Sequence, residues 1–230
     1  MRLRDVQGWI IPDMQSLNTK ALVAIFNTMA DAIEREKDQL CVLDGVIGDA
    51  DHGVTMSIGF TAVRKALGEI DTNTEPPSQV FNTAAKTFLN AVGASAGPLY
   101  ATAFMRAGAS IKGISAVDTV ALGSAIEAMA QGIQSRGKAE AGDKTMLDAW
   151  LPAAIAAQEA KETASMVGMM EAVERAASAG ALSTIDMLAK KGRSAKLGER
   201  TIGHQDAGAA STAILISAMT DAIKQTQTNT

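Results

Sequence analysis

Apolar residues in this chain recur every three or four positions, and no segment sustains the strict alternation of a half-buried strand. The first such series follows Asn18, a residue type favoured at helix N-caps, and lies on one helical face: Leu22, Phe26, Met29 and Ile33. Aromatic residues, which strands favour, make up only 3% of the chain. This periodicity predicts an all-α fold.

The same spacing predicts eight helices joined by loops. They are expected from Asn18 to the charged run 34–38, after Gly53, from Pro77, from Gly97-Pro98, over Leu122–Ile133, from an N-cap at Asp143, over Met166–Lys190 with Gly192 as the terminating residue, and from Asp206 to Ile223. Pro152 is expected to kink the sixth helix or to lie near its first turn. We expect one domain over residues 18–226, an N-terminal extension over 1–17, and a frayed tail over 227–230.

The composition excludes several classes of function. Hydrophobic residues make up 47% and charged residues 20% of the chain, as in a globular domain rather than a disordered one. The formal net charge of −4 argues against binding to nucleic acid, and the sequence has no run of apolar residues long enough to cross a membrane. The single cysteine, Cys41, rules out an intrachain disulfide, and residues 1–15 show no export signal, so we expect a cytoplasmic location.

Four of the expected loops are unusual because they are rich in glycine and carry Asp, His, Ser or Arg. They are Leu43–Thr55, Val92–Leu99, Arg136–Met146 and Lys191–Ser211. If the helices alternate in direction, the loops that follow the first, third, fifth and seventh helices lie at the same end of the bundle. Those are the four loops in question, so we expect them to form one site at that end.

Acidic residues are concentrated in the first of these loops, at Asp44, Asp49 and Asp51. Three carboxylates held together repel one another unless a cation lies between them, and such oxygen ligands suit Mg²⁺ or Ca²⁺. As an alternative, the same residues could cap the second helix and form Asx-turns. The two histidines, His52 beside this cluster and His204 in the fourth loop, are too few for a His-rich metal centre.

The other three loops have features that suit a phosphate group. A glycine-rich loop before a helix start presents free backbone N–H groups, and Val92–Pro98 has this form with Ser95 as a further donor. The third loop is close to a Walker A loop, but Asp143 interrupts it and no strand precedes it, so a P-loop fold is rejected. The fourth loop carries a basic cluster that either is solvated or faces the acidic loop: Lys191, Arg193, Lys196 and Arg200. The pattern predicts a Mg–nucleotide or Mg–phosphoester site on a helical bundle.

Four strings of this sequence resemble a known family: IGDADHG (47–53), VGASAGPLY (92–100), RGKAEAGDKTMLDAWLP (136–152) and KGRSAKLGERTIGHQDAGA (191–209). They are similar to the ADP-binding L subunit (DhaL) of dihydroxyacetone kinases. The resemblance implies an eight-helix antiparallel up-down barrel with the nucleotide site at one open end. It implies two Mg²⁺ ions held by Asp44, Asp49 and Asp51. It also implies that the nucleotide, ADP or ATP, is bound by His52, Gly53, Val54, Thr55, Ser95, Ala96, Gly137, Met146, Arg193, Asp206, Ala207 and Gly208.

The same resemblance implies a phosphotransferase that works with a partner. In this family a separate K subunit binds dihydroxyacetone covalently through a histidine, so no catalytic residue is assigned to this chain. In one subfamily ADP stays bound and is recharged by a phosphotransferase-system protein, and in the other ATP exchanges as a substrate. The separate L chain favours the first. We therefore expect the nucleotide-binding subunit of a kinase for dihydroxyacetone or a related short ketose.

Three alternatives remain open at this point. The chain could belong to an ATP-dependent triose or tetrulose kinase, be a metal-dependent phosphohydrolase with His52 as general acid or base, or be a helical adaptor whose loops are only turns. Three departures from the family pattern concern phosphate contacts. Thr55 stands where the family usually has Asn, Ser95 stands one residue early, and Ala207 replaces a proline. None of them alters the three aspartates.

Overall fold

The structure is a computed structural model, and it describes residues 16–93 and 95–228. Its α-helices are α1 (Thr19–Ile47), α2 (His52–Leu67), α3 (Pro77–Ala91), α4 (Ala96–Ser110), α5 (Thr119–Gly137), α6 (Leu147–Ala160), α7 (Met166–Ser183) and α8 (Ala207–Thr228). Two 3-10 helices, η1 (Thr184–Asp186) and η2 (Ser194–Thr201), lie between α7 and α8. Within these residues the β structure is limited to an isolated bridge, so the predicted all-α fold is confirmed.

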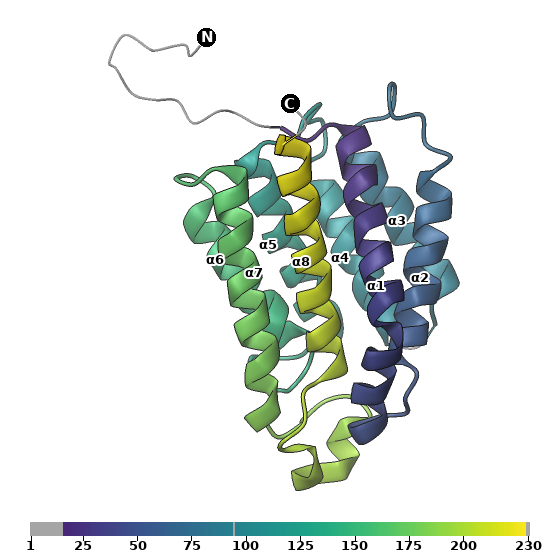
Figure 1. The fold of residues 1–230 in the computed structure, drawn as a ribbon, viewed down its shortest axis with the longest axis vertical. Helices are drawn as coiled ribbons and strands as arrows, with labels where there is room; N and C mark the ends of the chain where they lie inside the picture. Colours follow the sequence, from purple (N-terminus) through teal and green to yellow (C-terminus); the bar gives the residue numbers. More distant parts are fainter. Residues whose placement is uncertain (1–15, 94, 229–230) are drawn as a thin grey trace.

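The eight α-helices form a closed ring. Each helix packs against the next one along the chain, and α8 packs against α1 to close the ring. The helices run in alternate directions, and α1 and α8 lie side by side (Figure 1). The start of α1 and the end of α8 lie at one end of the ring, and the segment with η2 lies at the other, which we call the loop end. This arrangement confirms the predicted antiparallel up-down barrel.

Aromatic side chains are concentrated in one half of the ring. The five phenylalanines and the single tyrosine come from α1–α4 and pack mainly edge to face in the core: Phe26, Phe60, Phe81, Phe88, Tyr100 and Phe104. The ring centroids of Phe60 and Phe88, for example, are 5.5 Å apart. The buried residues of α5–α8 are mostly Ala, Met, Ile, Leu and Val, with Trp150 as the one large aromatic. Few aromatic residues are needed because small side chains let these helices pack closely.

Helix α1 is longer than the sequence predicted. We expected it to end in the charged run 34–38, but it continues to Ile47. Ile33, Leu40 and Ile47 are spaced by seven residues and are at most 3% exposed, so a narrow apolar stripe continues past the charged residues. The first connection therefore shrinks to residues 48–51, and Asp44 lies in the last turn of α1.

The expected N-cap at Asp143 is also wrong. Helix α6 begins at Leu147, and Asp143 instead accepts a hydrogen bond from the backbone N–H of Glu140 at 2.9 Å, which folds the preceding loop. Pro152 lies inside α6, in its second turn.

The ends of the last two helices differ from the prediction as well. Helix α7 ends at Ser183 rather than Lys190, because the chain tightens into η1 at Thr184. Gly192 has φ +68° in the turn before η2 and does not terminate α7. Helix α8 extends to Thr228, so residues 227 and 228 of the expected tail are helical.

The expected N-terminal extension lies outside the described residues up to residue 15. Leu17 is 4% exposed and exchanges two backbone hydrogen bonds with Val117, of 2.8 and 2.9 Å. These bonds attach the chain to the α4–α5 connection just before α1 begins. Over the described part of the chain, no helix combines the length and hydrophobicity needed to cross a bilayer.

Candidate nucleotide and metal site

A cavity of about 630 Å³ opens at the loop end. This volume falls within the range of small-molecule sites, about 300–1,000 Å³. Its wall comes from all four unusual loops, with Asp49 from the first, Ser95 from the second, Gly137 from the third and Arg193 from the fourth. The prediction that these loops meet at one end of the bundle is therefore confirmed.

The three aspartates of the first loop form a compact acidic cluster. One side-chain oxygen from each of Asp44, Asp49 and Asp51 lies within 4.8 Å of the others. The Oδ2 atom of Asp44 accepts hydrogen bonds from the backbone N–H groups of Asp51, at 2.9 Å, and of His52, at 3.2 Å. Asp44 thus caps the start of α2, so the alternative interpretation holds for this residue, whereas Asp51 at the N-cap position makes no side-chain cap bond. The capping by Asp44 does not use its Oδ1 atom. An all-oxygen cluster of this size fits a hard divalent cation such as Mg²⁺.

Arg193 reaches this cluster from the segment between η1 and η2. Its Nη1 atom forms an ion pair with Asp49 and lies 3.7 Å from Oδ2 of Asp51. The predicted placement of a basic residue of the fourth loop opposite the carboxylates is confirmed. A guanidinium at this position can also pair with phosphate oxygens through two parallel hydrogen bonds.

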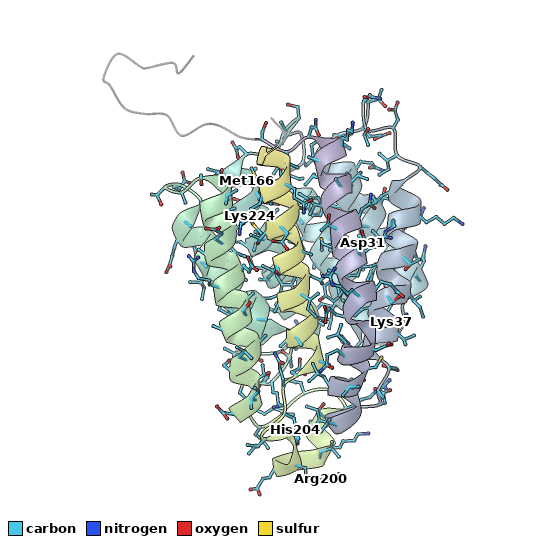
Figure 2. The ribbon with its side chains drawn as sticks, viewed as in Figure 1. Asp31, Lys37, Met166, Arg200, His204 and Lys224 are labelled. Carbon is cyan, nitrogen blue, oxygen red and sulfur yellow. The ribbon has the colours of Figure 1, made fainter. Side chains whose placement is uncertain are left out.

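His52 occupies the first position of α2 and connects it to α8. Its Nε2 atom lies 2.9 Å from the hydroxyl of Ser211, a fully buried residue of α8. Burial lowers the pKa of His52, and the nearby Asp44 carboxylate partly opposes this effect. The ring is therefore neutral at physiological pH and can donate or accept a single hydrogen bond at each nitrogen. The other histidine, His204, is exposed at the loop end (Figure 2).

Asp206 precedes α8 at the wall of the cavity. Its Oδ2 atom accepts a hydrogen bond from the backbone N–H of Ala209 at 2.8 Å, so Asp206 is the N-cap of this helix. Burial raises the pKa of Asp206 to about 6. The Ala209 N–H and the Lys144 ammonium favour its ionised form, whereas the carboxylates of Asp148 and Asp44 disfavour it. Asp206 therefore exchanges its proton at a pH close to neutral, whereas an ordinary aspartate is ionised there.

The third loop is held in its conformation by a carboxylate of α6, the helix that follows it. Asp148, in the first turn of α6, accepts backbone hydrogen bonds from Gly142 at 2.5 Å and from Thr145 at 2.8 Å. These bonds place Thr145 and Met146 on the cavity wall. Leu99 of α4 also lines the cavity, so an apolar surface suitable for a base is present.

Most of the predicted site residues line the cavity: Asp44, Asp49, Asp51, His52, Thr55, Ser95, Ala96, Gly137, Met146, Arg193, Asp206, Ala207 and Gly208. Gly53 and Val54 do not. A Cβ on Gly53 would lie 1.9 Å from the carbonyl oxygen of Lys37, so this residue is needed where α2 crosses α1 closely. Val54 is 46% exposed on the outer surface.

Other residues that line the cavity were not assigned to the site from the sequence, among them Ile58, Arg136, Lys144 and Thr145. Lys191, a member of the basic cluster expected in the fourth loop, also lines it. Arg136, Lys144 and Thr145 belong to the third unusual loop, and Lys191 begins the fourth, so membership of these motifs was an available signal. Ile58 lies in the second turn of α2, and an isoleucine within a helix does not by itself indicate a binding site.

Comparison with known proteins places this chain in a family. Residues 46–221 match the DAK2 domain, and this stretch is more than half of the chain. The chain belongs to the DAK2 domain family. It is 40% identical over 201 residues to the ADP-binding subunit DhaL of PEP-dependent dihydroxyacetone kinase 2 of Listeria innocua, which covers 87% of this chain and 93% of that protein. It is 36% identical over 211 residues to the ADP-binding subunit DhaL of PEP-dependent dihydroxyacetone kinase of Escherichia coli, covering 91% and 100%.

Two longer proteins match this chain over about a third of their own length. An L-erythrulose 1-kinase of Mycolicibacterium smegmatis is 33% identical over 199 residues, which are 86% of this chain and 34% of that protein. The crystal structure of the dihydroxyacetone kinase of C. freundii in complex with AMP-PNP and Mg²⁺ has a TM-score of 0.66 and 21% identity, and the match covers 96% of this chain and 37% of that one. This structural likeness confirms the fold, and the resemblance to L subunits drawn from the sequence is confirmed by the relatives.

Proposed function

We propose that this DAK2 chain is the nucleotide-binding subunit of a kinase for dihydroxyacetone or a related short ketose. It would hold Mg-ADP or Mg-ATP and transfer the phosphoryl group to a ketose on a separate K subunit. The observation that carries this proposal is the convergence of four motif loops on one cavity, where Arg193 pairs with two of three clustered carboxylates. The names of the two L-subunit relatives, at 36% and 40% identity, support the same activity.

The side chains of the cavity suit the parts of such a nucleotide. Asp44, Asp49 and Asp51 would hold Mg²⁺. The number of two ions is part of this proposal and rests on the resemblance of the sequence motifs to L subunits. Bound Mg²⁺ neutralises phosphate charge and orients the transferred group. Arg193 would pair with phosphate oxygens, and the backbone N–H groups at the start of α4, near Ser95, would donate to them.

The remaining predicted residues would bind the rest of the nucleotide. Met146 and Leu99 offer an apolar surface for the base, and Asp206 at the N-cap of α8 offers an acceptor for ribose or amino hydrogens. The serine that stands one residue early, Ser95, lines the cavity, as does Thr55 at the usual position of an asparagine. Both therefore keep a hydroxyl available for a phosphate contact.

The phosphoryl donor and the partner are also part of this proposal. Relatives at 36–40% identity are named PEP-dependent or PTS-dependent, so we favour bound ADP that is recharged by a phosphotransferase-system protein over exchanging ATP. We expect the ketose to be bound by the partner's histidine and both subunits to act in the cytoplasm. A tetrulose is the second candidate substrate, because an L-erythrulose 1-kinase is 33% identical to this chain.

Calorimetry with ADP, in the presence and absence of Mg²⁺, tests this function. We expect Mg²⁺-dependent binding of ADP to the isolated chain and phosphorylation of dihydroxyacetone only after addition of a K subunit and a donor. Folded protein that shows no Mg²⁺-dependent ADP binding would contradict the proposal. Hydrolysis of simple phosphoesters by the chain alone would instead indicate a phosphohydrolase. Mass spectrometry of the purified protein distinguishes the two donors, because tightly retained ADP indicates the recharging mode.

A further inference from the structure

Lys144 is the buried basic residue of the cavity wall, and the function proposed above gives it no role. Lys144 is only 2% exposed, although lysine is almost never fully buried without partners. Its backbone has φ +61°, in the left-handed region that disfavours residues with a side chain. Lys138, six residues earlier, is also left-handed, but it is exposed at the end of α5, where this conformation is common. A strained backbone that carries a buried charge indicates that the side chain has a specific task.

The ammonium of Lys144 joins two points of the chain that are distant in sequence. Its Nζ atom donates hydrogen bonds to the backbone carbonyl oxygens of Thr184, where η1 begins, and of His204, two residues before the N-cap of α8. The segment from Thr184 to the N-cap of α8, residues 184–206, contains both points and carries Arg193 and Asp206, and we call it the η segment. Lys144 thus holds the two ends of the η segment together.

Further bonds show that these ends are built as one unit. The backbone N–H of Asp206 donates to the hydroxyl of Thr184 at 3.0 Å, and the N–H of Gly203 donates to the carbonyl of Ile185 at 2.8 Å. Within the same loop as Lys144, the carbonyl of Asp143 accepts the N–H of Lys190 at 3.1 Å. The third loop therefore contacts the η segment near both of its ends and at Lys190.

The charges around Lys144 connect it to the cavity. Asp206 and Asp186 both face its ammonium and favour its charged form, whereas burial lowers its pKa. Asp206 in turn faces Lys144, Asp148 of α6 and Asp44 of α1. Lys144 is the cation among these groups, so it offsets the repulsion between carboxylates of three different elements.

We propose that Lys144 is a positioning residue of the nucleotide site, which fixes the ends of the η segment and so places Asp206 and Arg193 at the cavity. The proposal rests on the proposed function, because it assigns Lys144 a part in binding the same nucleotide. Lys144 has no part in holding the metal, whose ligands lie in the first loop. Its removal should therefore weaken nucleotide binding much more than metal binding.

The test compares Lys144→Met with Lys138→Met, an exposed lysine of the same loop and the same backbone conformation. We expect Lys144→Met to raise the Kd for ADP with Mg²⁺ by about tenfold or more, the effect of losing hydrogen bonds to a charged group. The affinity for Mn²⁺ alone, measured by electron paramagnetic resonance, should stay within about twofold of the wild type, and amide exchange should accelerate in the η segment. Ethylammonium added to Lys144→Ala should restore part of the ADP affinity, whereas ethanol, which fills the same space without a charge, should not.

Several outcomes would overturn this role. The proposal is refuted if Lys144→Met keeps the wild-type ADP affinity and the wild-type rate of amide exchange in the η segment. It is also refuted if the variant loses Mn²⁺ binding and ADP binding equally. If Lys144→Met does not fold, the ammonium of the wild-type protein is followed by ¹⁵N NMR. A slowly exchanging Nζ signal that shifts on ADP addition supports the proposal, and a freely exchanging one refutes it. A wild-type protein that binds neither Mn²⁺ nor ADP refutes the proposed function itself, which separates the two failures.

Discussion

Replacing Asp206 by asparagine is expected to stabilise the nucleotide-free protein at neutral pH. The pKa of this carboxyl rises from 3.8 to about 6 on folding, chiefly because the group is buried. Below about pH 3 the carboxyl is protonated in both the folded and the unfolded chain. Between pH 4 and 6 the folded state binds more protons, so the free energy of unfolding falls as pH rises, and above pH 6 the full penalty remains. At about 1.4 kcal/mol per pKa unit, the penalty is about 3 kcal/mol, an upper limit because the side chain is partly exposed.

Urea unfolding followed by circular dichroism, with a chelator present, measures this effect at several pH values. The asparagine variant should match the wild type near pH 4 and exceed it by up to about 3 kcal/mol at pH 8. Asparagine keeps an oxygen that can accept the N–H of Ala209, so the cap of α8 is retained. Asp118→Asn, at the N-cap of α5, is the matched control and should show no gain of this kind. A stability difference for Asp206→Asn that does not change between pH 4 and 8 would refute the argument.

Three further variants test the acidic cluster, its arginine and the crossing of α1 and α2. Asp49→Ala should keep the helical circular dichroism spectrum but lose the rise in Tm that Mg²⁺ with ADP produces, because ligands stabilise only the state that binds them. The control Asp71→Ala, in the α2–α3 connection, should keep that rise. An equal rise in both variants would show that Asp49 is not a ligand. Arg193→Ala should weaken ADP binding by roughly 1.5–3 kcal/mol in calorimetry, the scale of charge-assisted hydrogen bonds, without weakening Mn²⁺ binding, because its ion pair with Asp49 competes with a metal. Unchanged ADP affinity would mean that the guanidinium does not reach the nucleotide. Gly53→Ala should destabilise the protein by about 1–3 kcal/mol in thermal unfolding, because the added Cβ would lie 1.9 Å from the carbonyl oxygen of Lys37. In the control Gly93→Ala the added Cβ meets no atom within 4 Å, so its loss of stability should be much smaller. Equal losses of stability in the two variants would show that the close crossing of α1 and α2 can relax.

The fold could be predicted largely from local patterns. The stripe Leu22 to Ile33 and the prolines in the first turns of α3 and α4 act within a few residues, so the sequence alone indicates the helices they belong to. The continuation of α1 was missed because only Leu40 and Ile47 of its last part are fully buried, which is one residue per two turns. The end of α7 depends on contacts of Thr184 with Lys144 and Asp206, which no local pattern encodes.

The candidate site shows the same division. Its loops were found because glycine and aspartate at such density are unusual, and the alternation of helices then predicts that they meet. Gly53 was assigned to the nucleotide because it lies in a motif, whereas the structure uses it for the crossing of α1 and α2. The role of Lys144 could not be predicted because its hydrogen bonds go to backbone carbonyl groups of residues distant in sequence. Every residue has such a carbonyl group, so the sequence does not indicate these partners.

The contact between the first and the last helix has a consequence for the order of the chain. Since α1 begins and α8 ends at the same end of the ring, opposite the cavity, a short linker could join them without passing near any site residue (Figure 1). The connection between α4 and α5, residues 111–118, lies at that same end and could then supply new termini. A circularly permuted chain would keep every neighbouring pair of helices, so we expect it to form the same barrel whichever helix comes first in the sequence.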